Sequence, residues 1–305
     1  MGTIIRSAAI VSDNSFSSLE NSTLAGQRCV ATSGLCPSEI DALIFTGVYR
    51  DENVMEPSIA CLIQKQLGLG LDVDLFDSAQ SGVRKNSSHA PVFSFDIVNG
   101  ACGLLNAFSV ADAILKNQTA RNLLIISGDS HPSMGYREDF PFVATGGAVL
   151  LQWCDDPHRG IVANSYMSDL EKPSSINAYG DLTEFGENGR ENATILMDPT
   201  YSEHFLELSL GHINNFARLN DVAIDYLLTN EVVEGFASQL CQLSDMPDAC
   251  ESVAIFSSYG GDIHTSSLIA AYDALDRQGA LTPGKQLLFS SVGSGNAAAC
   301  AHYVV

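Results

Sequence analysis

The chain has 305 residues, of which 46% are apolar and 17% are charged, a composition typical of a soluble globular protein with room for one large core or two coupled cores. Its formal net charge is −21, from 36 acidic and 15 basic side chains, which argues against binding to nucleic acid or to an anionic membrane surface. No apolar run approaches the roughly 18 residues that would cross a bilayer.

The first residues, Gly2 to Val11, have the pattern of a strand and lack the flanks of a secretion signal. The eight cysteines show no C-x-x-C pair and no Cys/His ligand spacing, so we expect no metal site. Scattered cysteines in mostly apolar surroundings are typical of reduced thiols. These features predict a cytoplasmic protein.

Strands alternate with helices along the chain, without a linker rich in Pro, Gly or Ser, and this alternation predicts an α/β fold. After the first strand, the first half is expected to contain a strand at 39–46, a helix at 57–67, a strand before Cys102, a helix at 103–118, and strands at 123–127 and 146–151. An amphipathic helix is expected around 204–216.

The second half repeats these elements in the same order. Its expected elements are a strand at 223–229, helices at 233–243 and 269–278, and strands at 286–291 and 296–305. Two phrases also match, Ile-Asp-x-Leu at 40–43 and 224–227, and Asp-Ala-Ile/Leu at 112–114 and 273–275. Any α/β chain repeats its elements, but matching phrases in matching order favour an internal duplication. We therefore expect one half at 1–155 and another at 156–305.

Cys102 lies where an expected strand meets an expected helix, on a short run of small residues. The N–H groups and dipole of a helix N-terminus favour a thiolate, so this position predicts an acyl-transfer nucleophile. The alternative is a small buried apolar cysteine. Because a duplicated unit brings equivalent turns together, Cys102 is expected to share a site with the turn that carries Asp262 and His264.

Several motifs, in order along residues 35–305, resemble the ketoacyl-synthase III branch of the thiolase superfamily. They are Asp41-Ala-Leu-Ile, Pro57-Ser-Ile-Ala-Cys-Leu-Ile-Gln, the run from Phe95-Asp-Ile to Ser109-Val-Ala-Asp, and Val292-Gly-Ser-Gly295. The resemblance implies a five-layered α-β-α-β-α sandwich, usually dimeric. It also implies acyl transfer from a CoA or acyl-carrier-protein thioester onto a cysteine and then to an acceptor, with no cofactor.

The chain departs from the Cys, His and Asn catalytic set of this family at every member. A gapless match puts Ala101 at the nucleophile position, whereas a one-residue deletion puts Cys102 there, and we favour the deletion. The family His falls on Asn230. The family Asn falls on Asp262, or on His264 if the His-Thr-Ser phrase is matched instead.

The residues that are present suggest a rearranged site. His264 is expected to act as the base for Cys102, with Asp262 orienting the imidazole. The side-chain N–H of Asn230 is expected to hold a carbonyl oxygen. Gly293 and Gly295 resemble the family loop that supplies an oxyanion N–H.

The family segment that grips the CoA nucleotide with Trp and Arg has no counterpart, because 12–35 is polar and rich in Ser and the only Trp is Trp153. This favours a carrier-protein thioester, or a partner that supplies the substrate. Two functions follow. One is a thioester-dependent acyltransferase or condensing enzyme of specialised metabolism with an acyl-Cys intermediate. The other is a catalytically inactive partner of a heterodimeric ketosynthase-like enzyme. A homodimer or a heterodimer is expected.

Overall fold

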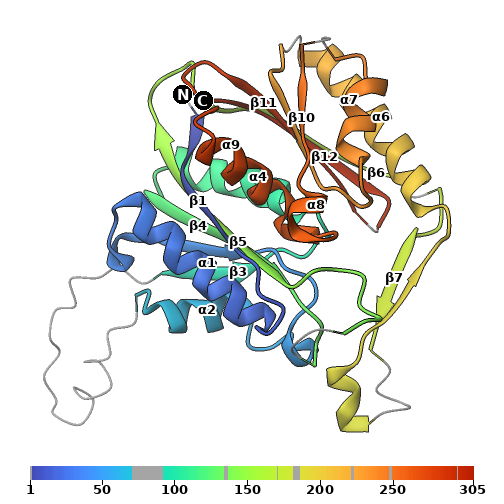
Figure 1. The fold of residues 1–305 in the computed structure, drawn as a ribbon. Coiled ribbons are helices and arrows are strands. Elements are labelled where there is room, and N and C mark those ends of the chain that lie inside the picture. Colours follow the sequence, from blue (N-terminus) through green and yellow to red (C-terminus); the bar gives the residue numbers. More distant parts are fainter. Residues whose placement is uncertain are drawn as a thin grey trace, which may run out of the picture.

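A computed structural model describes residues 2–70, 92–133, 137–169, 171–180, 186–220, 223–246, 249–293 and 295–305, without the side chains of 186–188. Within these residues two five-stranded sheets lie on either side of a shared pair of helices (Figure 1). None of the described helices is long and apolar enough to cross a membrane.

The first sheet is formed by the N-terminal part of the chain. Its strands, in spatial order, are β1 (Gly2–Val11), β5 (Thr145–Cys154), β4 (Asn122–Asp129), β2 (Ala42–Phe45) and β3 (Phe93–Asp96). β4, β2 and β3 are mutually parallel, whereas β1 and β4 both pair antiparallel with β5. All eight residues of β4 are buried, as expected for a strand covered on both faces.

The second sheet repeats this arrangement with the C-terminal part of the chain. Its strands, in the equivalent order, are β6 (Gly160–Ser168), β12 (Ala297–Val304), β11 (Gln286–Gly293), β9 (Tyr226–Thr229) and β10 (Glu251–Val253). The pairing is again antiparallel for the first three strands and parallel for the last three. The predicted α/β fold of two duplicated halves is therefore confirmed.

Helices complete the five layers (Figure 1). α4 (Gly103–Lys116) and α9 (Ser267–Arg277) lie between the sheets and contact strands of both. α1 (Ser18–Ser33) and α2 (Ile59–Leu67) cover the outer face of the first sheet. α6 (Tyr201–Asn220) and α7 (Phe236–Leu243) cover the outer face of the second.

The central layer is joined to the sheets by apolar packing. On α4, Phe108 is fully buried and meets Phe289 of β11 edge-to-face at 5.7 Å. On β12, Ala297, Ala299 and Ala301 belong to the same buried cluster. Because these side chains are single methyl groups, the helices approach the second sheet closely.

Shorter elements complete the described chain. β7 (Ile176–Tyr179) and β8 (Thr194–Met197) follow β6 and precede α6 in the chain, and they form a separate small antiparallel sheet. The remaining short helices are η1 (Pro37–Glu39), η2 (Asp51–Asn53), η3 (Gly186–Glu191), α8 (Phe256–Tyr259) and η4 (His264–Ser266).

The sequence analysis did not predict α1, because its residues are mostly small and polar. The helix begins with a capping box formed by Ser17 and Glu20. It lies so close to the sheet that its hydroxyls bond the backbone of β4, with Ser22 Oγ donating to Ser127 O at 3.1 Å. Small polar side chains therefore serve this close contact, which a hydrophobic pattern does not reveal.

We expect Gly146→Ala to destabilise the protein. A Cβ on Gly146, in β5, would lie 2.3–2.4 Å from backbone atoms of Asn21 and Ser22 in α1, and backbone cannot move aside cheaply. Overpacking of this kind costs about 1–3 kcal/mol. Urea unfolding measures the loss. As a control, Gly211→Ala in α6 meets nothing within 4 Å and should gain about 0.5–1 kcal/mol from helix propensity. Equal stabilities of the two variants would contradict the close contact.

Candidate functional site

A small enclosed cavity lies where the ends of β9 and β11 meet η4. Its free volume is about 10 Å³, close to the minimum for one water molecule. Four of the six predicted site residues line it, namely Asn230, Asp262, His264 and Gly293. The other lining residues are Tyr49, Phe142, Ile176, Phe205, Val232 and Val292. The structure thus brings most of the predicted site together.

Cys102 does not line this cavity. Its sulfur is fully buried and lies 3.6 Å from the carbonyl oxygen of Ser291 and 3.5 Å from that of Ala297. Burial raises the pKa of the thiol to about 12, only partly opposed by the contact with Ser291. The expectation that this thiol is acidic is therefore wrong, because burial disfavours its charged form.

Gly293 lies between the cavity and the sulfur. It lines the cavity, and a Cβ built on it would stand 3.6 Å from Cys102 Sγ and 3.7 Å from the backbone nitrogen of Ala101. The sulfur is thus one residue beyond the cavity wall. Ala101 and Cys102 are both buried, and neither lines the cavity. The structure therefore does not decide between the gapless alignment, which puts Ala101 at the nucleophile position, and the alignment with a one-residue deletion, which puts Cys102 there.

His264 is the imidazole of the cavity. Its Nδ1 lies 3.2 Å from Oδ2 of Asp129, an ion-pair contact whose angles fall short of a regular hydrogen bond. The ring stacks on Phe142 with centroids 4.5 Å apart and meets Tyr49 at 5.5 Å. Burial lowers the pKa of His264, but the Asp129 charge outweighs it, so the pKa is raised overall.

Asp129, at the end of β4, is the residue that the sequence analysis missed. Its carboxylate accepts backbone N–H groups from Val48 at 2.9 Å and Tyr49 at 2.8 Å, and both the N–H and the hydroxyl of Thr265. Although burial raises the pKa of Asp129, His264 and these hydrogen bonds outweigh it and keep the pKa low. A fully buried ionised carboxylate therefore faces the imidazole.

Asp262 has a different role from the predicted one. Its Oδ1 accepts the backbone N–H of His264 at 2.7 Å, so it holds the turn, whereas Asp129 contacts the ring. Burial, together with the Asp129 and Glu231 charges, raises the pKa of Asp262 to about 6 against the lowering effect of His264. The cavity thus contains a carboxyl group that is partly protonated near neutral pH.

Asn230 is held by the backbone of β11. Its Nδ2 donates to Val292 O at 3.0 Å, and its Oδ1 accepts the N–H of Val292 at 2.9 Å. One N–H of the amide remains for a ligand in the cavity. Gly295 lies in an exposed turn and does not line the cavity, and Ser294 is outside the described residues. Among the described residues, no group of three His, Cys, Asp or Glu side chains is placed to hold a metal ion.

Comparison with known proteins agrees with this architecture. No family model matches the chain. The Beta-ketoacyl-[acyl-carrier-protein] synthase III of Coxiella burnetii is 28% identical over 292 residues, which is 89% of this chain and 78% of the relative. Over most of its length, the chain is therefore similar in sequence to ketoacyl-synthase III proteins.

Solved structures of synthases share the fold of this chain. The 3-oxoacyl-(acyl carrier protein) synthase III of Pseudomonas aeruginosa superposes with a TM-score of 0.76 at 14% identity, covering 100% of this chain and 98% of the other. A priming beta-ketosynthase of a polyketide biosynthetic pathway gives a TM-score of 0.78 at 15% identity, covering 99% and 96%. At these identities the likeness concerns the fold.

We expect Asp129→Asn to lower the pKa of His264, because the charge that raises it is lost while burial remains. NMR titration of the imidazole protons measures this. His212, whose Nε2 contacts Ser165 Oγ at 2.9 Å and not Asp129, serves as the internal control. An unchanged titration of His264 would show that Asp129 does not set its charge.

The same variant should lose stability in a defined pH window. The raised pKa of His264 gives stability below about pH 6.5 that is lost as the pH rises through its folded pKa. The lowered pKa of Asp129 gives stability above about pH 4 that is lost as the pH falls. The difference in the free energy of unfolding between wild type and variant should therefore be largest between about pH 4 and pH 6.5, where it is expected to be about 3–5 kcal/mol.

Proposed function

We propose that this chain is a thioester-dependent acyltransferase or condensing enzyme whose general base is His264, positioned by Asp129. The observation that carries the proposal is the buried contact of 3.2 Å between His264 Nδ1 and Asp129 Oδ2 beside the cavity. An imidazole held in this way at Nδ1 keeps Nε2 free to accept a proton. The relatives named as synthases support the acyl-transfer class.

The proposed reaction does not need the thiolate form of Cys102. Nε2 of His264 takes the proton of the acceptor, the acceptor attacks the thioester carbonyl carbon, and the carbon–sulfur bond breaks. The proton then passes to the departing thiolate. We propose that the remaining amide N–H of Asn230, which lines the cavity together with Gly293, binds the oxyanion. Since the base must be neutral, activity is expected to fall as the pH drops through the pKa of His264.

An acyl-Cys102 intermediate remains the alternative route. It requires the wall at Gly293 to open, because the sulfur is fully buried and separated from the cavity by that residue. A thiol with a pKa of about 12 is also a poor nucleophile near neutrality. Direct transfer at His264 also requires the cavity to widen, because its free volume suits about one water, but it does not depend on the buried thiol.

The substrate is proposed to be an acyl-carrier-protein or acyl-CoA thioester. A pocket of about 580 Å³ lies beside the cavity and shares Tyr49 with it, so it offers space for the carrier arm. Arg190 lines this pocket at an exposed position. Departure from the family's catalytic set supports a role in specialised biosynthesis. Eight free thiols agree with a reducing, cytoplasmic location.

A second candidate is a non-catalytic partner of another ketosynthase-like chain. The observation that favours it is the combination of a buried sulfur with a cavity that has room for about one water. In this case His264 and Asp129 would stabilise the fold without taking part in a reaction. The two candidates differ in whether any thioester is turned over.

Release of free thiol from hexanoyl-pantetheine in the presence of a primary amine tests these functions. We expect turnover by the wild type, a loss of about 10²–10⁴-fold in His264→Asn, and retention in Cys102→Ala. His302→Asn replaces a similarly buried imidazole that lines neither the cavity nor the pockets beside it, and it is the matched control. Intact-protein mass spectrometry is run on the same samples.

The outcomes separate the three possibilities. An acyl adduct lost in Cys102→Ala would replace direct transfer by the covalent route. Neither adduct nor turnover, together with co-purification of a second synthase-like chain, would support the partner role.

We infer that the protein pairs with a second chain through β3. This strand is at an edge of the first sheet, and its Phe93 is 65% exposed while contacting Phe95 at 5.0 Å. An exposed aromatic edge strand is an interface or an aggregation site. Phe93→Lys is expected to convert a dimer into a monomer in light scattering. Val162→Lys, at an exposed position of β6, is the control. A monomeric wild type would refute the pairing.

A further inference from the structure

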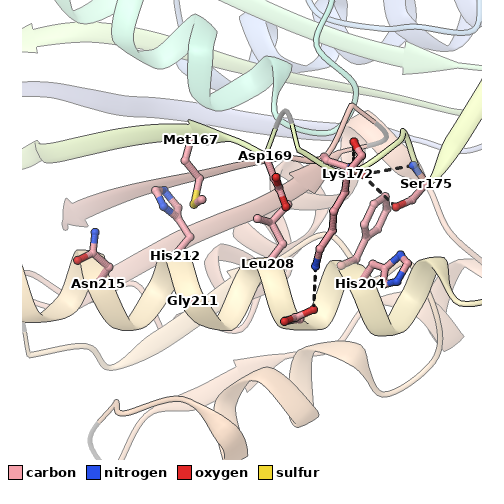
Figure 2. Close-up of a pocket in the computed structure, with 12 residues that line it drawn as sticks. Met167, Asp169, Lys172, Ser175, His204, Leu208, Gly211, His212 and Asn215 are labelled. Carbon is pink, nitrogen blue, oxygen red and sulfur yellow. Dashed lines mark hydrogen bonds and ion pairs between the residues drawn. The ribbon is translucent and has the colours of Figure 1, made fainter.

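A pocket of about 410 Å³ lies between β6 and α6 (Figure 2). Figure 2 shows Met167 and Asp169 on the strand side, with His204, Leu208 and His212 along the helix opposite. The volume is within the range typical of small-molecule sites, which is about 300–1,000 Å³. The proposed reaction assigns no role to this pocket.

One residue, Phe205, borders both this pocket and the cavity beside His264. Phe205 lines both spaces and is 2% exposed. The neighbouring wall is also continuous, because Ser175 lines the pocket and the next residue, Ile176, lines the cavity. The ring of Phe205 is therefore a partition between His264 and the pocket, and its movement would join the two spaces.

The lining of the pocket suits an uncharged chain. Met167, Phe205 and Leu208 supply apolar surface, and Gly211 leaves open space because a Cβ there meets nothing within 4 Å. The ammonium of Lys172 is paired with Glu207 at 3.2 Å, on the exposed side of the pocket.

His212 adds no fixed charge to the pocket. Its Nε2 is bonded to Ser165 at 2.9 Å, and burial lowers the pKa of its imidazole. With Lys172 already paired to Glu207, the described lining offers no free Lys or Arg for the phosphate of a carrier arm, and it also contains the acidic Asp169. An aliphatic group is therefore the better occupant.

We propose that the pocket between β6 and α6 binds the acyl chain of the thioester, and that Phe205 determines which acyl chains reach His264. The inference rests on the proposed acyl transfer at His264. The cavity beside His264 has about 10 Å³ of free space and cannot hold an acyl group by itself. The acyl chain needs an adjoining space, and the pocket behind Phe205 provides one.

Binding of S-alkyl-pantetheines tests the inference without any reaction, because a thioether has no carbonyl to attack. Isothermal titration with butyl, hexyl and octyl chains should show wild-type affinity rising with length, by up to about fourfold for each methylene that is buried. Gly211→Leu fills part of the pocket and should remove this dependence on length, because it weakens octyl binding more than butyl binding. Gly211→Ala is the matched small substitution and should retain it.

Phe205→Ala removes the partition and should raise octyl affinity by about tenfold or more relative to butyl affinity. Phe216→Ala removes an equally buried ring from the same helix but lines neither space, so it controls for lost stability. Length-independent binding in the wild type, or an unchanged length profile in both Gly211→Leu and Phe205→Ala, would overturn the inference. Length-dependent binding without turnover would instead refute the proposed function and leave the pocket assignment standing.

Discussion

The contact between His264 and Asp129 joins the two halves of the molecule at their centre. Asp129 ends β4 of the first sheet, and His264 begins η4 of the second half, so each half contributes one side chain. The same junction contains a hydrogen bond of 2.8 Å between the hydroxyls of Ser127 and Ser266. A buried carboxylate is tolerated only with a partner and hydrogen bonds, and Asp129 has both. Its environment therefore constrains how the halves meet.

This pairing also changes the balance between sulfur and nitrogen chemistry in the site. The imidazole of His264 is buried, but the neighbouring charge keeps its protonated form accessible. The sulfur of Cys102 is buried against the backbone carbonyls of Ser291 and Ala297, so desolvation raises its pKa. At these two helix starts, burial disfavours the charged form of Cys102, whereas the Asp129 charge favours the charged form of His264. The difference comes from their neighbours and not from their positions in the fold.

The sequence was sufficient for the fold and for much of the cavity. Alternating strands and helices with matching phrases predicted the duplicated sheets. The expected convergence of turns holds for Asp262 and His264, which line the cavity, but not for Cys102, and Asn230 was expected in the site from the family resemblance. It failed for α1, where small polar residues hide a helix that lies against the backbone of β4. It also missed Asp129, whose only signal was an acidic residue at the end of a buried strand. The burial of Cys102 depends on contacts with β11 and β12, nearly 200 positions away in the chain, which local patterns do not encode.

The alanines of β12 have a further consequence for how this protein can vary. Ala297, Ala299 and Ala301 set the spacing between the second sheet and the central helices, and each is at most 2% exposed. A wider side chain here would push α4 outward and shift the residues that precede it, including the surroundings of Cys102. Substitutions that change side-chain volume should therefore be tolerated in the outer helices, whereas the central layer accepts only replacements of similar volume.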